Sequence, residues 1–288
     1  MQNFREYNKK LASLRNMQRV TSTMKMVSAT KLRRAQEAQK HATAYTAELS
    51  RMVERLAQAT QISHPLLTAR SPVRNALLVV ITSDRGLCGG FNNRLQREVS
   101  HWLDTNRDVF RRVRVSFCGR RGHEFFKDKV EVRSVYEGVV ARPDFASASG
   151  IGAELRKLFL AARYDEVYLA YNRFKSAMVQ VPVVERLLPL ANERKPVAES
   201  GPLAFYLFEP VEAELLGLLL EKTVNFRVFF ALLENAAGEH GARMTAMDNA
   251  TNNIEDLTEH YTLLRNQARQ ASITTELVEI ISGAEALK

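Results

Sequence analysis

A glycine-rich loop is the part of this sequence that comes nearest to a ligand-binding motif. It reads Ser-Asp-Arg-Gly-Leu-Cys-Gly-Gly-Phe-Asn over residues 83–92, after an apolar run typical of a strand and before a helical stretch. Backbone N–H groups in such a turn could bind a phosphate. The spacing matches neither GxGxxG nor a P-loop, since no Gly-Lys-Ser/Thr follows. The sequence therefore favours a tight strand-to-helix turn, with Asp84 and Arg85 in a local ion pair or a protein contact.

The remaining reactive side chains form no recognisable site. Cys88 and Cys118 each follow a predicted strand and could lie close together, but no CxxC is present, so reduced structural thiols are favoured over a redox pair. The six histidines show no HExxH or Cys/His spacing. No Ser/His/Asp set or carboxylate pair stands out. These residues therefore predict no metal site and give only weak support to an enzyme.

Composition narrows the class of protein and of partner. The 288 residues are 45% hydrophobic and 25% charged, as in a soluble globular protein of one or two domains. A formal charge of +9 favours an acidic partner, which could be nucleic acid, a membrane surface or a protein face. The first ten residues carry charge where a secretory signal is apolar, and no run approaches the roughly 18 apolar residues of a membrane span. We expect a reducing, cytosolic setting, with any membrane association through a partner.

The N-terminal residues 1–60 predict one long helix. All eight prolines lie from Pro65 to Pro210, and no glycine precedes Gly86. At about 1.5 Å per residue, a continuous helix here is roughly 90 Å long. Apolar side chains recur three and four residues apart, and a heptad pattern from Ala35 onward indicates a coiled coil. The apolar pattern runs through Phe4, Tyr7, Leu11, Leu14, Met17, Val20, Met24 and Val27, and the heptad seam through Ala38, Ala42, Tyr45, Leu49, Met52, Leu56 and Ala59.

Residues 211–288 predict a second long helix. They hold 6 basic and 12 acidic side chains, a net −6, whereas residues 1–60 hold 12 basic and 4 acidic, a net +8. Opposite charge predicts that the two helices pair, in antiparallel fashion if the middle is an inserted domain. Gly238 and Gly241 predict either a close approach of another element or a weak point. The seam runs through Met247, Ala250, Ile254, Leu257, Tyr261, Leu264, Ala268 and Ala271, then Ile273, Leu277 and Ile280.

The middle, residues 61–210, alternates strands with helices. This order predicts a mostly parallel sheet with helices on its faces, a Rossmann-like α/β domain inserted between the helices of an antiparallel coiled-coil shaft formed by residues 1–60 and 211–288. The stretch from Pro189 to Pro210 is predicted to return the chain to the second long helix. The expected strands are 77–82, 113–117, 130–135, 167–171 and an edge strand 178–187, and the expected helices are 93–102, 122–127 and 146–162.

Three segments together resemble a known family. They are Met-Lys-Met-Val at 24–27 followed by Lys-Leu-Arg-Arg-Ala-Gln at 31–36, the glycine-rich loop at 83–92, and Ala-Arg-Met-Thr-Ala-Met-Asp-Asn-Ala-Thr at 242–251 followed by residues 268–277. In this order, over almost the whole chain, they are similar to the gamma subunits of F-type ATP synthases. The resemblance implies the fold already described, with the α/β domain at the base of the coiled coil.

The resemblance also implies a function and partners. A member of this family is the central rotor shaft, which couples ion flow through the membrane sector to ATP synthesis by rotation. Its expected partners are the alpha and beta subunits of the catalytic head, an epsilon subunit and the membrane c-ring, in a complex with one copy of this chain. No catalytic residue, cofactor or nucleic acid is expected. The expected location is peripheral, at the cytoplasmic face of a bacterial inner membrane, because no inserted cysteine pair like that of chloroplast relatives is present.

The family's functional positions carry over to seven residues. Met24 and Lys25 match the shaft segment that meets an acidic lever loop of a beta subunit. Arg243, Gln270, Thr274 and Glu276 match polar positions that engage the catalytic subunits, and Arg269 lies beside them. Two other functions stay open from the residues alone. They are a nucleotide-binding α/β enzyme with coiled-coil arms and a basic coiled-coil scaffold for nucleic acid.

Overall fold

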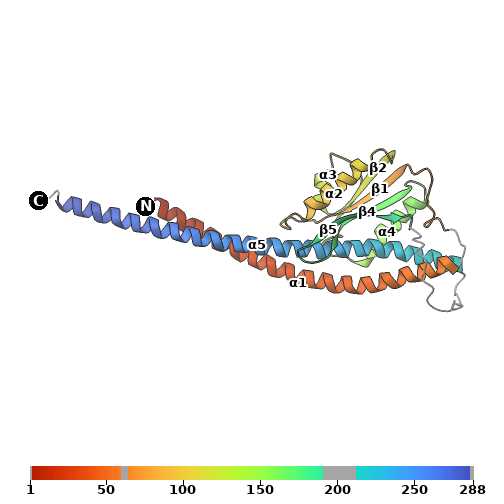
Figure 1. Cartoon of the computed structure of the whole chain (residues 1–288), viewed down its shortest axis with the longest axis horizontal. Coiled ribbons are helices and arrows are strands. Elements are labelled where there is room, and N and C mark those ends of the chain that lie inside the picture. Colours follow the sequence, from red (N-terminus) through yellow and green to blue (C-terminus); the bar gives the residue numbers. More distant parts are fainter. Residues whose placement is uncertain (1, 60–63, 191–211, 286–288) are drawn as a thin grey trace. The chain divides into compact units, whose positions relative to one another are not determined.

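Two long helices flank a sheet domain in the sequence (Figure 1). The computed structural model describes residues 2–59, 64–190 and 212–285. Helix α1 extends over Gln2–Ala59 and helix α5 over Glu212–Glu285. Both lie where the sequence lacks proline, which would remove a backbone N–H donor and clash with the preceding turn. The two predicted helices are thereby confirmed. The predicted return from Pro189 to Pro210 lies outside the described residues, apart from its first two positions.

The middle of the chain builds one five-stranded sheet with the order β3-β2-β1-β4-β5. Strands β1 to β4 are parallel, and β5 pairs with β4 in antiparallel fashion at the edge. Helical crossovers return the chain to the same end of the sheet, so that successive strands run parallel as predicted. The strands are β1 (Asn75–Ile81), β2 (Arg112–Cys118), β3 (Glu131–Tyr136), β4 (Glu166–Phe174) and β5 (Gln180–Leu188), and the helices between them are α2 (Phe91–Thr105), α3 (Arg120–Phe126) and α4 (Phe145–Leu160).

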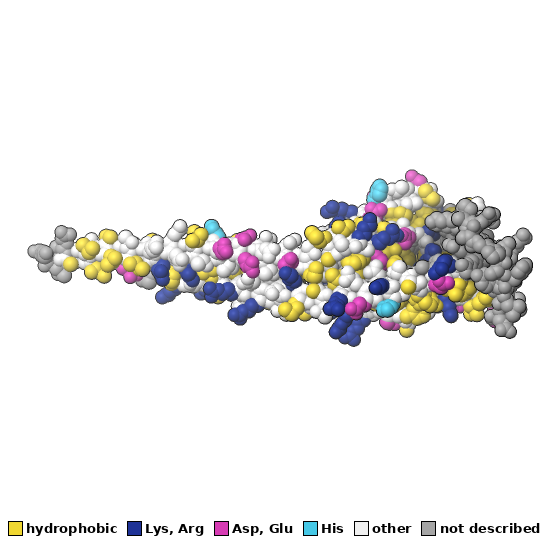
Figure 2. All heavy atoms as spheres, turned by 60° about the horizontal axis from the view of Figure 1, so that its bottom comes forward, with side chains coloured by type: hydrophobic (Ala, Val, Ile, Leu, Met, Phe, Trp, Pro, Cys, Tyr) yellow, Lys and Arg dark blue, Asp and Glu magenta, His cyan; other side chains and the backbone are white. Residues whose placement is uncertain are grey.

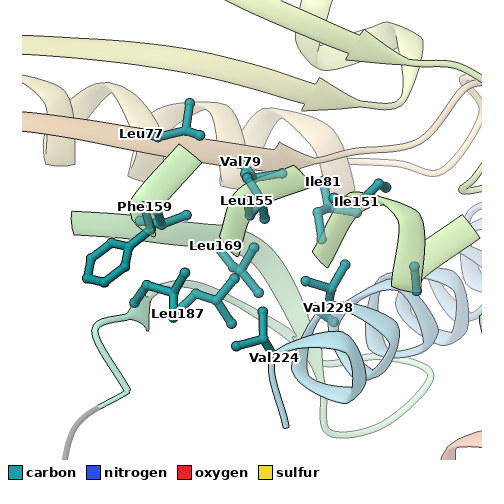
Figure 3. Close-up of a cluster of buried hydrophobic side chains, with 14 of the residues drawn as sticks. Leu77, Val79, Ile81, Ile151, Leu155, Phe159, Leu169, Leu187, Val224 and Val228 are labelled. Atoms are coloured by element: carbon teal, nitrogen blue, oxygen red, sulfur yellow. The ribbon is translucent and has the colours of Figure 1, made fainter. Parts of the chain in front are cut away.

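Strand β1 forms the centre of the core because both of its faces are covered. Leu77, Val79 and Ile81 belong to one buried cluster with side chains of α4 and α5, as Figure 3 shows. Leu78 and Val80 belong to a second cluster with side chains of α2 and α3. Successive side chains of a strand point to opposite faces, so a strand covered on both sides needs the uninterrupted apolar run that its sequence has.

The chain divides into two compact units. We call residues 30–242, which contain the sheet, the sheet unit, and residues 1–29 with 243–288 the helical unit. Within each unit α1 and α5 are antiparallel, as predicted. Residues later in α1 contact residues earlier in α5. The pairs are Gln18 with Glu255 and Lys25 with Asp248 in the helical unit, and Gln39 with Glu234 and Tyr45 with Phe226 in the sheet unit.

The seam of α1 differs from the predicted one. Met17, Val20 and Val27 are 50–57% exposed and Met52 is also exposed, so the prediction is wrong at these positions. Tyr45 is exposed as well but stacks on Phe226 of α5. The side chains of Leu56 and Ala59 lie outside the description. A heptad set of positions that are partly buried or bonded to α5 runs instead through Leu11, Leu14, Gln18, Thr21, Lys25 and Ser28 in the helical unit and Leu32, Ala35, Gln39, Ala42, Thr46, Leu49 and Val53 in the sheet unit.

Hydrogen bonds between the helices explain why polar residues occupy this seam. In the helical unit, Gln18 Nε2 donates to Glu255 Oε1 over 2.9 Å, and Thr251 Oγ1 lies 2.8 Å from Thr21 Oγ1. A helix turns by about 100° per residue, so a stripe one position away faces a different direction. Counting apolar residues alone therefore finds buried seam positions such as Leu11 and Leu49 but omits the polar ones.

Candidate functional site

The glycine-rich loop is held by its own hydrogen bonds. Ser83 Oγ donates to the carbonyl oxygen of Arg85 over 2.7 Å, and the Ser83 N–H donates to Asn92 Oδ1 over 3.1 Å. Leu87 and Gly89 adopt positive φ values of 63° and 55°, which fold the chain back between β1 and α2. The structure thus has the predicted tight strand-to-helix turn. The Asp84 carboxylate accepts from the backbone N–H of Arg120 over 3.1 Å, which ties the loop to the start of α3.

Two pockets lie beside α3, near the ends of β1, β2 and β3. One, of about 400 Å³, is lined by the glycine-rich loop, Arg121 and Phe125, and the other, of about 470 Å³, by residues that include Asp84 and Arg120. Arg120 and Arg121 both lie within 4 Å of the Glu124 carboxylate, so these cations are already paired. Among the described residues, no cluster of three or more His, Cys, Asp or Glu side chains could hold a metal ion.

The two cysteines are both free and buried in the structure. Cys118 packs in the cluster shared with α4 and α5, whereas Cys88 packs against Phe91 and Ala242. Burial, followed by the charge of Asp84, raises the pKa of the Cys118 thiol to about 12. A thiol is nucleophilic as its thiolate, so Cys118 is unreactive at neutral pH.

Met24 and Lys25 lie at a polar contact between the two helices of the helical unit. Lys25 Nζ donates to the carboxylate of Asp248, and the two side chains are 46% and 45% exposed. Met24 is half-buried, whereas Met26 and Val27 beside it are exposed. The structure thus places an exposed ion pair next to exposed apolar side chains, an arrangement suited to a protein partner.

Asp248 belongs to this site but is absent from the sequence-based prediction. Asp248 and Glu255 lie seven residues apart on α5, opposite Lys25 and Gln18, which lie seven apart on α1. The signal that identifies the Lys25–Asp248 pair is a repeat of seven residues on both helices, with acidic residues on α5 and hydrogen-bond donors on α1. It is visible only when polar residues are considered as seam positions.

The C-terminal end of α5 is a second candidate surface. Gln2 lies 16 residues before Gln18, and Ala271 lies 16 residues beyond Glu255, so α5 after Ala271 continues past the level of the described part of α1. Hydrophobic side chains appear at the surface beside the C-terminal end in Figure 2. Even so, none of the described helices is long and apolar enough to cross a bilayer. The exposed large apolar residues of this end are Ile273, Leu277, Val278, Ile280 and Ile281.

The predicted polar positions of α5 fall into two groups. Arg269, Gln270, Thr274 and Glu276 are exposed at the C-terminal end. Arg243 is 9% exposed, so most of its side chain is covered within this chain. Asp248, the partner of Lys25, and Arg269 are 21 residues apart on one helix, which corresponds to about 30 Å. The structure therefore separates the predicted contact residues into two surfaces rather than one site.

Comparison with known proteins identifies similar chains over the full length. A family model described as ATP synthase matches residues 3–287. The ATP synthase gamma chain of Geobacter sp. (strain M21) is 43% identical over 288 residues, which is all of both chains. The ATP synthase gamma chain of Anaeromyxobacter sp. (strain Fw109-5) is 44% identical over 293 residues, again all of both chains.

Solved structures agree with the fold. A chain of the central stalk and c-ring structure of Tetrahymena thermophila mitochondrial ATP synthase is 27% identical, with a TM-score of 0.59, covering 80% of this chain and 99% of that one. A chain of the Euglena gracilis mitochondrial ATP synthase in rotational state 3 has a TM-score of 0.62 at 19% identity, covering 99% of this chain and 94% of that one. The second likeness concerns the fold alone.

Proposed function

The chain belongs to the family of ATP synthase gamma chains, and on this premise we propose how it contacts its partners as the rotor shaft of the central stalk. In this role the chain couples ion flow through the membrane sector to ATP synthesis by rotation. It is a non-catalytic subunit by family. The bond-forming chemistry belongs, in this proposal, to residues of the beta subunits.

The proposed assembly contains one copy of the chain. The chain is seated with an epsilon subunit on the membrane c-ring and enters a head of alpha and beta subunits, at the cytoplasmic face of a bacterial inner membrane. Bacterial relatives of full length support this location, and a similar solved chain comes from a central stalk and c-ring. The net charge of +9 is assigned to acidic protein partners and not to nucleic acid.

The proposed division of labour follows the predicted boundaries. Residues 1–60 and 211–288 form the shaft, and residues 61–210 form the base domain that faces the membrane sector. The confirmed helices α1 and α5 and the sheet between them support this division. In the structure the C-terminal half of α1 and the N-terminal part of α5 share a compact unit with the sheet. The base domain is therefore packed with part of both helices.

Met24 and Lys25 are proposed to meet an acidic lever loop of a beta subunit. The exposed apolar side chains of Met17, Val20 and Val27 on α1 support a protein contact in this region. An exposed ion pair contributes only about 0–1 kcal/mol to folding, so Lys25 can exchange Asp248 for a carboxylate of the partner with little change in stability.

The C-terminal end of α5 is proposed to turn inside the opening of the catalytic head. The observation that carries this proposal is the run of exposed apolar side chains after Ala271, beyond the level of the described part of α1. Arg269, Gln270, Thr274 and Glu276 lie exposed on the same stretch, where they can hydrogen-bond with the wall of that opening. Because the shaft is asymmetric, each orientation favours one conformation of each beta site, which is a population shift driven by rotation.

Co-purification of a tagged chain from its native membranes tests this function. Recovery of alpha and beta subunits with ATPase activity is expected, and a bead on the tagged chain should then rotate during hydrolysis. A solitary chain that binds nucleotide, or a salt-sensitive complex with DNA or RNA, contradicts the proposal. Truncation after Ala271 provides the matched test of the end of α5, because it removes the exposed apolar residues and no residue of the sheet unit.

A further inference from the structure

One face of α5 in the sheet unit is covered by several other elements. We call it the glycine face; it consists of Glu234, Asn235, Gly238, Gly241 and Ala242. With about 3.6 residues per turn, these five positions lie on one side of the helix. The contacts described below reach α1, α2, the residue after β1, and β4, β5 and the turn between them. Figure 1 shows α5 passing beside β4 and β5.

The two glycines let neighbouring side chains and backbone come closer to α5 than any residue with a Cβ atom would allow. A Cβ atom at Gly238 would lie 3.0 Å from Phe91 Cε2 and 3.3 Å from Gln180 Cγ. A Cβ atom at Gly241 would lie 3.0 Å from Ala177 Cα and 3.2 Å from its carbonyl oxygen. Carbon atoms in favourable contact are about 3.5–4.0 Å apart. Of the two interpretations left open by the sequence, close packing is the one that the structure supports.

Buried hydrogen bonds hold the same face. The Glu234 carboxylate accepts from the backbone N–H of Phe174 and from the side chain of Gln39. Asn235 Nδ2 donates to the carbonyl oxygen of Thr82 over 3.2 Å. Glu234 and Asn235 are both buried. These bonds join α5 to the ends of β4 and β1 and to α1.

The turn that presses on Gly241 is itself braced. Gln180 Nε2 donates to the carbonyl oxygen of Ala177 over 2.8 Å, and Arg94 donates to Gln180 Oε1 over 2.8 Å. Rotation of α5 about its own axis, in either direction, would bring a neighbouring residue with a Cβ atom to the position of Gly241. Close-packed interiors transmit such strain rather than absorb it. The turn and α5 are therefore constrained to move together.

We propose that the glycine face is the joint through which torque passes between the sheet domain and α5. The inference rests on the proposed function, in which the membrane ring turns the sheet domain. Gly238 and Gly241 are positioning residues in this joint, because they act through Phe91 and Ala177. The joint resists rolling of α5 by backbone contact at Gly241 and by the buried bonds of Glu234 and Asn235.

The two glycines differ in a way that makes the proposal testable. Gly238 meets the end of a side chain, so shortening Phe91 makes room for a methyl group there. Gly241 meets backbone atoms, so Ala177→Gly makes no room. We expect Phe91→Leu to rescue Gly238→Ala, whereas Ala177→Gly does not rescue Gly241→Ala. Gly150→Ala in α4 is the control, since no atom lies within 4 Å of the added Cβ.

The experiment uses the whole complex in inverted native membrane vesicles, with ion pumping measured per ATP hydrolysed. Gly241→Ala is expected to lower this ratio, and Gly150→Ala is expected to leave it unchanged. Faster hydrogen exchange of the Phe174 amide, which donates to Glu234, should accompany the loss. Faster exchange with an unchanged pumping ratio overturns the proposal, because torque then passes around the joint.

Two further arms keep the test decisive. If Gly241→Ala fails to assemble, Phe91→Leu loosens the joint without a clash. A lower pumping ratio then supports the proposal, and an unchanged ratio overturns it. The wild-type complex separates the two hypotheses. If it yields no partners or ATPase activity, the proposed function fails, whereas the rescue pattern between Gly238 and Phe91 can still be measured by unfolding of the full chain.

Discussion

Helix α5 has one environment beside the sheet and another at its C-terminal end. In the sheet unit Leu220, Val224 and Leu232 are fully buried. In the helical unit Leu277 and Ile280 are exposed, at 54% and 68%. Residues of similar hydrophobicity thus serve folding in one region and remain available for a partner in the other. The comparison teaches that burial, and not residue type, indicates what an apolar side chain of this helix does.

Replacement of leucine in the two regions is expected to show the largest difference. Leu220→Ala should lower the free energy of unfolding by about 2–5 kcal/mol, because it leaves a cavity in the core. Leu277→Ala should change it by less than about 0.5 kcal/mol, because the side chain is exposed. Denaturant unfolding of the purified chain measures both. Similar losses for the two variants would contradict the contrast between the regions.

Alanine at two helical glycines should move stability in opposite directions. Gly241→Ala is expected to lower the free energy of unfolding by about 1–3 kcal/mol through overpacking against Ala177. Gly150→Ala is expected to raise it by up to about 1 kcal/mol, because alanine is the better helix former and the site is open. Thermal unfolding of the two variants beside the wild type gives the sign of each effect. Stabilisation by both substitutions would mean that Gly241 is not closely packed.

The buried carboxyl of the sheet unit should give a pH dependence. Burial raises the pKa of Glu234 above its ordinary value of 4.5, an effect opposed by the Phe174 N–H and the Gln39 side chain. The Glu234 carboxyl group therefore binds its proton more tightly in the folded chain than in the unfolded chain. The contribution of Glu234 is fully stabilising below pH 4.5 and is lost as pH rises through the raised pKa.

Glu234→Gln should remove this part of the pH dependence. Unfolding of the variant and the wild type, measured from pH 4.5 to pH 8, should give a flatter stability profile for the variant. Glu276→Gln, which changes an exposed carboxylate of the helical unit, is the control. Parallel profiles for Glu234→Gln and the wild type would contradict the assignment.

Neutralising the exposed ion pair should have the smallest effect on stability. Asp248→Asn is expected to change the free energy of unfolding by less than about 1 kcal/mol. In the complex it should strengthen the contact of Lys25 with an acidic partner and alter ATP-driven pumping, more at low salt than at high salt. Glu255→Gln removes the neighbouring negative charge, keeps an oxygen that can accept from Gln18 and leaves Lys25 paired, so it should not alter pumping. Equal pumping in both variants would exclude Lys25 from the partner contact.

Most secondary structure and the order of elements could be predicted from the chain. Proline and glycine are absent where α1 formed, and β1 is a short β-branched run because both of its faces are covered. The seam of α1 was predicted correctly at buried apolar positions such as Leu11 and Leu49 but not at its polar positions. Gln18, Lys25 and Gln39 are polar, and only the residues that face them on α5 explain why they lie between the helices.

The candidate site was predicted in part. The sequence resemblance pointed to Lys25 and to the polar end of α5, but the functional positions carried over from it did not include Asp248 or the exposed apolar stripe of Met17, Val20 and Val27. Periodicity assigns apolar residues to the interface between the two helices of this chain, because it contains no information about a partner that is a separate chain. An exposed apolar stripe that contacts such a partner is therefore predicted, wrongly, to be buried within the chain.

The sequence by itself determined two long helices, an α/β domain between them and membership of a family, because these depend on local propensity, periodicity and motifs. Tertiary structure decided which stripe of α1 faces α5, why Gly238 and Gly241 lie within a helix, and which apolar residues stay exposed. The physical reason is that each of these depends on the atoms opposite a residue. Ala177 and Phe91 lie 64 and 147 residues away in the chain from Gly241 and Gly238, and only folding brings them within contact.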